Sequence, residues 1–475
     1  MRIASTRIIS SRKSTTACML KPSVLKELEK IVGRANVFTD AEELVVYSYD
    51  ATRQESLPWA VARPATAREV SEILILANRE RFPVVPRGAG TGMSGGSVPA
   101  SGGLVLSFER MNRILEIDEQ NRVAVVEPGV ITGDLQREAE ARGLFYPPDP
   151  ASHQFCTLGG NVAECAGGLR AVKYGVTRDY VLGLEVVLPT GEIIETGART
   201  MKSVAGYDLT RLIVGSEGTL GIVTKIIVKL LHLPESTRTL AAYFPDIRSA
   251  AQAVSNITSS AIIPRALELI DGGALRAVEN YLKQDISGGS GAMLLVEVDG
   301  SLSLSASEIA TLERICRETG AVKVKRAENK SEQDNLWKIR RSISPALYTI
   351  KPRKINEDIV VPPSRVPDII AEVQEIAKRY GLLIVTFGHA GDGNIHVNIL
   401  IEDEERQNAE KAVKDVFVAV LRMQGSISGE HGIGLSKANY LPMEVGIHAL
   451  EAMKKIKMAL DPNNIMNPGK IFIEK

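Results

Sequence analysis

Residues 83–96 read Pro-Val-Val-Pro-Arg-Gly-Ala-Gly-Thr-Gly-Met-Ser-Gly-Gly, an apolar strand that runs straight into a glycine-rich loop. Seven of the sixteen residues from Gly88 to Gly103 are glycine. Glycine adopts positive φ without strain and lets backbone N–H groups approach a phosphate closely. The stretch therefore predicts a cradle for a nucleotide pyrophosphate, and the alternative is a flexible surface loop.

The spacing of these glycines argues against the two commonest nucleotide loops. Gly88 and Gly90 match the start of a dinucleotide fingerprint, but Met93 stands where the third glycine belongs. Residues 93–103 also cannot form the helix that should follow. No Gly-Lys-Ser/Thr triplet follows the loop, so it is not a Walker A motif. A nicotinamide-binding Rossmann domain is therefore disfavoured.

Outside this loop the chain divides into segments with different patterns. Before residue 235 we expect a helix capped by Ser23, a helix from about Thr66, a helix over 132–142, and strands at 104–108, 122–127, 181–188, 192–195 and 221–231. After it, predicted strands at 240–244, 293–298, 383–387 and 395–401 alternate with amphipathic helices at 246–258, 303–319, 366–380 and 403–424. That alternation predicts an α+β domain around an antiparallel sheet.

These patterns suggest four parts of the chain. We expect a flexible tail over 1–22, a nucleotide-binding domain over 23–235, a second α+β domain over 236–425, and a helical C-terminal segment over 426–475. The chain has 475 residues, which at about 100–200 residues per domain agrees with two or three domains.

Composition excludes several classes of protein. Lys plus Arg and Asp plus Glu number 57 each, so the net charge is zero and general nucleic-acid binding is not expected. The four cysteines, Cys18, Cys156, Cys165 and Cys316, lie far apart without a CxxC pair. This spacing excludes a cysteine-built zinc site, an iron–sulfur cluster within the chain and a disulfide scaffold. No apolar stretch is long enough to predict a transmembrane helix.

The first 26 residues are basic and rich in Ser and Thr, with no acidic residue before Glu27. That composition is typical of an organelle transit peptide. The alternatives are an unstructured tail and a natural start at Met19. We expect a cytoplasmic protein, with membrane association only through a partner, or a mitochondrial matrix protein if the tail is a transit peptide.

Three of the six histidines fall in two glycine-bracketed segments. Segment 388–398 contains His389 and His396 between apolar strands, and segment 425–434 contains Glu430 and His431. A glycine-rich turn can bring His389 and His396 to one point, and two imidazoles with a carboxylate suit zinc, manganese or iron(II). The alternative is a pair of structural loops whose histidines are hydrogen-bonded.

These motifs resemble one flavoprotein family. Residues 86–92 with 94–96 look like the diphosphate loop of the vanillyl-alcohol-oxidase type of FAD-binding domain. Segments 147–152, 157–161, 166–168, 174–175 and 215–223 look like its further flavin segments, in the expected order. The resemblance covers roughly residues 40–475 and is strongest to the branch of D-lactate dehydrogenase, the glycolate oxidase large subunit and D-2-hydroxyglutarate dehydrogenase. It implies an α+β protein: a PCMH-type FAD-binding domain, an antiparallel-sheet cap domain that binds substrate, and a helical C-terminal segment that returns to the flavin site.

The resemblance also implies that small residues and backbone groups hold FAD non-covalently, without bonds to His153, Cys156 or Cys165. The implied FAD-binding residues are Pro86, Arg87, Gly88, Ala89, Gly90, Thr91, Gly92, Ser94, Gly95, Pro148, Asp149, Ser152, Thr157, Gly159, Gly160, Asn161, Gly167, Gly168, Tyr174, Gly175, Glu217, Gly218, Gly221, Ile222, Val223 and Asn467.

The same resemblance implies roles for polar residues of the C-terminal half. His389, His396 and Glu430 would hold the divalent metal, and His431 would act as general base. Glu430 and His431 are adjacent and would point oppositely on a regular strand, so we expect the flanking glycines 429 and 432 to bend the backbone. The implied substrate-binding residues are Arg340, which would take the carboxylate, Ser344 and Lys354, with Lys351 or Arg353 as alternatives to Lys354.

Together these features predict an FAD- and metal-dependent dehydrogenase that oxidises a D-2-hydroxy acid, D-lactate first and glycolate second, to the 2-oxo acid. Electrons would pass to an iron–sulfur subunit, an electron-transfer flavoprotein, a cytochrome or a quinone-linked carrier. Two alternatives stay open: a flavin oxidase that uses oxygen directly, and a non-catalytic flavin-binding subunit of a larger redox complex. We expect a homodimer or a hetero-complex.

Overall fold

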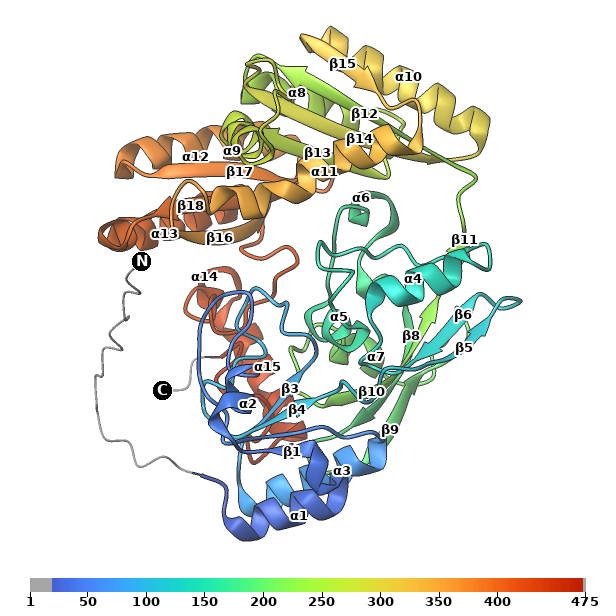
Figure 1. The fold of residues 1–475 in the computed structure, drawn as a ribbon, viewed down its shortest axis with the longest axis vertical. Coiled ribbons are helices and arrows are strands. Elements are labelled where there is room, and N and C mark those ends of the chain that lie inside the picture. The colour runs from blue at the N-terminus through green and yellow to red at the C-terminus, as the bar shows by residue number, and fades with distance from the viewer. Residues whose placement is uncertain (1–18, 473–475) are drawn as a thin grey trace, which may run out of the picture.

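The computed structural model describes residues 19–472 and shows two lobes stacked along the long axis of the molecule (Figure 1). The first lobe contains residues 20–235 and the C-terminal segment from residue 430 onward, and the second lobe contains the residues between them. Helix α1 (Pro22–Val32) begins at the last residue of the predicted tail, and residues 1–18 of that tail lie outside the described chain. Ser23 does not cap α1: Lys21 precedes the helix, and Pro22 takes the first turn, where a missing N–H is tolerated.

The described part of the first lobe contains two larger sheets and a two-stranded one. A four-stranded sheet has the order β1-β2-β4-β3, and β4 pairs with β2 and β3 in parallel. A five-stranded antiparallel sheet has the order β5-β6-β10-β8-β9, and β7 pairs with β11. The strands are β1 (Val37–Phe38), β2 (Ala60–Ala62), β3 (Val84–Arg87), β4 (Leu104–Ser107), β5 (Ile114–Asp118), β6 (Val123–Val126), β7 (Leu144–Phe145), β8 (Val181–Val187), β9 (Ile193–Gly197), β10 (Ile222–Lys229) and β11 (Leu231–His232).

Helices cover these two sheets and complete two apolar cores. α1 and α3 pack on the four-stranded sheet, and α4, α5 and α7 pack on the five-stranded sheet. α3 begins beside Thr66 as predicted, and the Thr66 side chain caps it by accepting a hydrogen bond from Glu69 N at 3.1 Å. After α1, the helices of this lobe are α2 (Ala41–Val45), α3 (Ala67–Glu80), α4 (Thr132–Glu140), α5 (Leu158–Glu164), α6 (Ala171–Tyr174) and α7 (Leu209–Ile213).

The second lobe is a seven-stranded antiparallel sheet with the order β15-β12-β14-β13-β17-β18-β16. Helices α8, α10, α12 and α13 pack on one face, and α9 and α11 pack on the other. The strands are β12 (Ser236–Phe244), β13 (Ala266–Asp271), β14 (Ala292–Gly300), β15 (Lys323–Arg326), β16 (Arg353–Val360), β17 (Leu383–His389) and β18 (Asn394–Ile401). The helices are α8 (Ile247–Thr258), α9 (Gly272–Leu282), α10 (Leu302–Glu318), α11 (Lys330–Leu347), α12 (Val366–Tyr380) and α13 (Arg406–Arg422).

The C-terminal segment crosses back from the second lobe to the first, where it is drawn in red beside the blue N-terminal elements (Figure 1). It forms α14 (Leu441–Glu444) and α15 (Ile447–Leu460) and then pairs with β3, where Val84 N donates to Ile465 O at 2.7 Å. Buried Lys457 donates to the carbonyl of Thr219 at 2.8 Å. These bonds hold the segment against the loops that carry the glycine motifs.

The predicted α+β class and the antiparallel sheet of the second lobe are confirmed. Several elements of the second lobe were not predicted, among them β13, α9, β15 and β16. The strand expected at 221–231 is divided into β10 and β11, and the helix expected at 403–424 begins at Arg406 after a short 3₁₀ turn. Within residues 19–472, none of the helices has both the length and the apolarity needed to cross a bilayer.

Candidate active site between the two lobes

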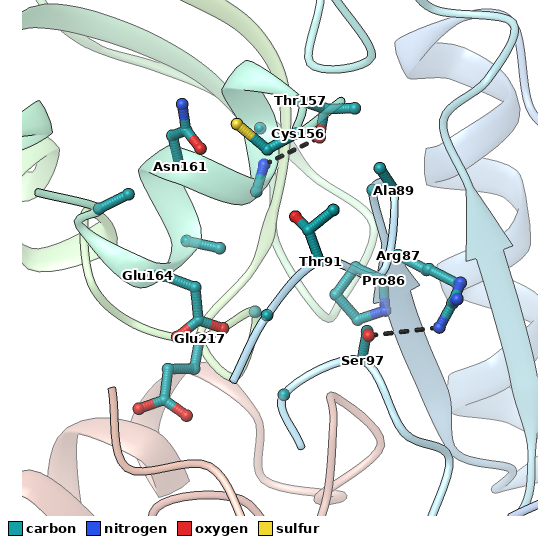
Figure 2. Close-up of a pocket in the computed structure, with 18 of the residues that line it drawn as sticks. Pro86, Arg87, Ala89, Thr91, Ser97, Cys156, Thr157, Asn161, Glu164 and Glu217 are labelled. Atoms are coloured by element: carbon teal, nitrogen blue, oxygen red, sulfur yellow. Dashed lines mark hydrogen bonds between the residues drawn. The ribbon is translucent and has the colours of Figure 1, made fainter. Parts of the chain in front are cut away.

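The glycine-rich loop after β3 forms one wall of a pocket in the first lobe (Figure 2). α5 and segment 213–223 form further walls, and Glu430 and His431 of the C-terminal segment also line it. The residues predicted to bind FAD that line this pocket are Pro86, Arg87, Gly88, Ala89, Gly90, Thr91, Gly92, Ser152, Thr157, Gly159, Gly160, Asn161, Gly167, Glu217, Gly218, Gly221, Ile222 and Val223.

The other residues predicted to bind FAD do not line the pocket: Ser94, Gly95, Pro148, Asp149, Gly168, Tyr174, Gly175 and Asn467. Tyr174 instead donates its hydroxyl to Asp299 of the second lobe at 2.7 Å. Asn467 donates to the carbonyls of Gly96 and Glu217 at 2.9 and 2.8 Å. Tyr174 therefore connects the two lobes, and Asn467 connects the glycine-rich loop to segment 213–223.

The pocket wall fits a flavin dinucleotide. Most of its residues are small, so backbone groups are accessible to a ligand. Gly218 has φ +66°, and a Cβ there would lie 2.5 Å from Pro86 Cγ, so the backbone crossing needs glycine. Arg87 donates to the Tyr49 carbonyl at 2.7 Å and to the Ser97 hydroxyl (Figure 2), so its guanidinium braces the loop.

Glu164 is a pocket residue that the motifs did not reveal, since one acid among small residues carries no distinctive pattern. Its Oε2 is buried without a hydrogen-bond partner among the described residues. Burial, together with the nearby Glu217 and Asp50, raises its pKa well above the usual range. A neutral carboxyl there can donate a hydrogen bond to a ligand and does not repel a pyrophosphate. Burial also raises the pKa of the Cys156 thiol, which disfavours the thiolate that covalent attachment would need.

The predicted histidine pair comes together at the end of the β17–β18 hairpin. His389 ends β17, His396 lies on β18, and both point to the sheet face covered by α9 and α11. Glu430 Oε1 lies 3.5 Å from His389 Nε2 and 3.6 Å from His396 Nε2. One potential ligand atom from each of the three residues lies within 4.8 Å of the others. Two imidazole nitrogens and a carboxylate oxygen at this spacing fit a divalent cation of the zinc, manganese or iron(II) class.

Two carboxylates, Glu268 and Glu430, flank His389. Glu268 Oε1 lies 2.6 Å from His389 Nδ1. Burial alone would lower the pKa of His389, but Glu268 and Glu430 outweigh it and raise that pKa well above the usual value. Burial and His389 lower the pKa of His396 to about 3, so this imidazole is neutral and can act as a ligand. The same negative field that attracts a proton to His389 favours a bound cation.

The loop that carries Glu430 and His431 is held from both lobes. Asp358 Oδ2 on β16 accepts hydrogen bonds from the backbone N–H groups of residues 429, 430 and 431 at 2.7–3.0 Å. Glu217 in the first lobe accepts from Ile433 N and Gly434 N, both at 2.7 Å. Of the two glycines expected to bend the backbone, Gly429 and Gly432, only Gly432 has a positive φ, at +82°. The loop is therefore irregular as expected, and its shape depends on one carboxylate from each lobe.

His431 lies beside the metal-type cluster rather than within it. Its ring stacks on that of His396 with centroids 5.6 Å apart, and its Nε2 is 4.0 Å from Glu430 Oε1. Its Nδ1 lies 3.3 Å from Asp358 Oδ1, without the angle of a hydrogen bond. Asp358 also pairs with buried Lys437. Although burial opposes it, the nearby His431 and Lys437 hold the pKa of Asp358 well below its usual range.

The predicted substrate residues lie on the same side of the sheet. Arg340 on α11 donates from Nε to Glu268 at 2.5 Å, and its guanidinium lies 4.7 Å from the Phe387 ring centroid. Lys354 Nζ on β16 donates to Ser344 Oγ at 2.7 Å. Burial, and next the nearby charge of Arg53, lowers the pKa of Lys354 to about 8. Of the two alternatives to Lys354, Lys351 pairs with Glu405 and Arg353 with Asp403.

Sequence reasoning did not find the supporting residues Glu268, Asp358, Lys437 and Asn398. Asn398 Oδ1 is buried without a partner among the described residues, two positions after His396 on β18. Glu268 and Asp358 lie on β13 and β16, which were not predicted, and an acid on a strand gives no indication of its partner because strand register sets it. Only Asn398 carried a local signal, its place at the end of the motif that contains both histidines.

Two family models match this chain. The model described as an FAD binding domain matches residues 58–197, and the model described as the C-terminal domain of FAD linked oxidases matches residues 233–471. The chain is 47% identical over 458 residues to the glycolate oxidase subunit GlcD of Bacillus subtilis, covering 96% of this chain and 97% of the relative.

Two other relatives are named for other substrates. The chain is 36% identical over 439 residues to D-lactate dehydrogenase of Anaerostipes hadrus, covering 89% and 92% of the two chains. It is 35% identical over 465 residues to D-2-hydroxyglutarate dehydrogenase of Stutzerimonas stutzeri, covering 96% and 100%. Among solved structures, p-cresol methylhydroxylase with substrate bound has a TM-score of 0.79 at 18% identity, covering 95% of this chain and 96% of that one. At that identity the likeness concerns the fold alone.

Proposed function

Because this chain belongs to the family of FAD-linked oxidases, we propose that it is an FAD- and divalent-metal-dependent dehydrogenase of small D-2-hydroxy acids. D-lactate is the first expected substrate and glycolate the second. The observation that carries the proposal is the meeting of two sites: Glu430 and His431 line the flavin-type pocket, and Glu430 also faces the ligand nitrogens of His389 and His396.

Each of these side chains has a distinct part in the proposed reaction. Arg340, with the Nη groups that Glu268 leaves free, binds the substrate carboxylate as a bidentate partner, and Ser344 and Lys354 add a hydrogen bond and a positive charge. His431, in its neutral form, accepts the proton of the 2-hydroxyl group at Nε2. His389, His396 and Glu430 would hold a zinc, manganese or iron(II) ion. These roles orient C2 of the substrate toward the pocket where FAD would lie.

The two cofactors would supply chemistry that no side chain offers. FAD, when bound non-covalently in the pocket, supplies the acceptor for the hydride that leaves C2. A divalent cation, when bound, supplies a positive charge that lowers the pKa of the 2-hydroxyl. The products are then the 2-oxo acid and a reduced flavin. Electrons would leave to a protein or quinone-linked acceptor, since the cysteine spacing excludes an iron–sulfur cluster of its own.

Two other functions can be separated from this one. A flavin oxidase would form peroxide in air without an added acceptor. A non-catalytic flavin-binding subunit would show no turnover with any acceptor, and the complete set of His389, His396, Glu430 and His431 disfavours it. A subunit that needs a partner for electron transfer is still a dehydrogenase in dye-linked assays.

A dye-linked assay on the purified full chain tests the proposal. Turnover is measured with D- and L-lactate, glycolate, D-malate and D-2-hydroxyglutarate, before and after chelation and after Mn²⁺ is restored. We expect D-lactate to be oxidised fastest, the activity to fall on chelation, and Mn²⁺ to restore it. Turnover unaffected by complete metal removal would contradict the metal requirement, and preference for L-lactate would contradict the stereochemistry.

A further inference from the structure

We propose that Glu268 is a positioning residue. Its single buried carboxylate orients both the arginine that binds the substrate carboxylate and one of the metal-ligating histidines. The inference rests on the proposed function, because it takes Arg340 as the anchor of the substrate carboxylate and His389 as a metal ligand. Glu268 is fully buried and does not line the flavin-type pocket, and its two contacts are to Arg340 and His389. Its effect would therefore pass through the two side chains that it holds.

The first contact fixes the orientation of Arg340. Glu268 Oε2 accepts from Arg340 Nε at 2.5 Å, and the Phe387 ring supports the guanidinium from its face. No other hydrogen bond to Arg340 is found within residues 19–472. Since Nε is taken by Glu268, the terminal Nη groups remain available for a carboxylate. The guanidinium is buried, with 9% of Arg340 exposed, so it has little freedom to turn away.

The second contact fixes the orientation of His389. Glu268 on β13 is directly opposite His389 on β17 in the strand register, and its Oε1 meets His389 Nδ1 at 2.6 Å. A carboxylate on Nδ1 holds the proton there and leaves the Nε2 lone pair toward Glu430 and His396. His396, by contrast, has no hydrogen-bond partner for its Nδ1 among the described residues. Glu268 is thus an orienting group for one histidine of the pair.

One carboxylate serves both contacts, and this makes the inference testable. Arg340 Nε and His389 Nδ1 are both donors, so both need an acceptor oxygen. Glutamine has the shape of glutamate but only one acceptor oxygen, and its NH₂ group would face the other donor. Glu268→Gln should therefore weaken either contact or both, whereas a carboxylate needed only for packing would be replaced without loss.

The test compares Glu268→Gln with Glu297→Gln in the full chain. Glu297 is a matched control on the adjacent strand β14: it is buried, paired with Arg265 and hydrogen-bonded to Trp337 Nε1 at 2.8 Å, and it contacts neither Arg340 nor His389. Mn²⁺ alone is titrated by electron paramagnetic resonance, which needs no turnover, and KM and kcat are measured for D-lactate at saturating Mn²⁺. FAD absorbance and the melting temperature check the fold.

We expect Glu268→Gln to weaken Mn²⁺ binding by about 10–100-fold, as for other groups that orient metal ligands. We also expect its KM for D-lactate to rise, with a smaller change in kcat. Glu297→Gln should match the wild type in Mn²⁺ affinity and in KM. The inference is overturned if Glu268→Gln retains wild-type values of both quantities, or if Glu297→Gln shows the same losses. If Glu268→Gln does not fold, Glu268→Asp takes its place, because a side chain shorter by one methylene cannot reach both donors.

Two further variants separate this inference from the proposed function. His389→Ala with wild-type Mn²⁺ affinity would refute the proposed metal site itself. His389→Ala without Mn²⁺ binding, alongside a wild-type-like Glu268→Gln, would refute only the role of Glu268. Arg340→Met should raise KM but not weaken Mn²⁺ binding, because Glu268 still holds His389. A loss of Mn²⁺ affinity in Arg340→Met as large as that in Glu268→Gln would overturn the shared-carboxylate explanation.

Discussion

The flavin-type pocket of the first lobe and the histidine cluster of the second meet at Glu430 and His431, but different parts of the chain build them. The pocket is made from small residues and loop backbone, and a Cβ added at Gly218 would collide with the side chain of Pro86. The cluster is made from long polar side chains, and its geometry depends on the buried carboxylates Glu268 and Asp358. The first site is therefore sensitive to volume, and the second to charge and hydrogen bonding.

This comparison predicts that the two sites can be disabled separately. The largest effect is expected for His431→Ala, which should slow flavin reduction by D-lactate about 10²–10⁴-fold, as for the loss of a general base. FAD and Mn²⁺ should stay bound, because His431 lies beside the ligand set. His389→Ala should instead lose Mn²⁺. Stopped-flow spectroscopy measures the rate of flavin reduction, and metal analysis measures the Mn²⁺ content of each variant. Loss of metal from His431→Ala would show that His431 is itself a metal ligand.

A smaller effect, on the other site, is expected for Gly218→Val. The positive φ of residue 218 and the close approach of the new Cβ to Pro86 should cost about 1–3 kcal/mol of strain. We expect reduced FAD content and a lower melting temperature, while Mn²⁺ affinity of the folded protein stays at the wild-type value. The flavin absorbance per mole of protein and a Mn²⁺ titration give both quantities. A parallel loss of metal would show that the two sites are not independent.

The role of Lys354 should appear as a pH dependence of the KM for D-lactate. Its pKa is lowered to about 8, so its charge is present below that pH and is lost as pH rises through it. If the charge binds the substrate carboxylate, KM for D-lactate should rise above pH 8 by about tenfold, the value of one charge-assisted hydrogen bond. Lys354→Met should have the high KM at every pH. The same pH dependence in that variant would exclude Lys354 as its origin.

The smallest effect is expected for Tyr174→Phe, which tests whether Tyr174 binds flavin or joins the lobes. Loss of the hydroxyl that donates to Asp299 should lower the free energy of unfolding by about 0.5–1.5 kcal/mol. Lys173 and Arg265 still pair with Asp299, so the lobes should stay together. FAD affinity should equal that of the wild type. A weaker FAD complex at unchanged stability would instead support the flavin-binding role.

Local sequence determined the parts of this protein that depend on backbone conformation and on neighbouring residues. The glycine loop after β3 and the histidine-containing hairpin are contiguous motifs, so the pocket wall and the His389–His396 pair could be predicted from residue types and spacing. The alternation of strands and amphipathic helices likewise predicted the α+β class of the second lobe. Even so, the sequence placed Ser23 as a cap where proline starts the helix, because local capping signals compete.

Only the tertiary structure decided which polar groups support the site. Glu268 lies 121 residues before His389, and Asp358 lies 73 residues before His431. Their roles follow from the pairing of β13 with β17 and from the docking of the loop that carries His431 onto β16. A shift of one residue in the strand register would turn Glu268 to the opposite face of the sheet. Register is set by the packing of both faces of the sheet against helices, a property that no single segment carries, and so the orienting carboxylates became visible only in the folded chain.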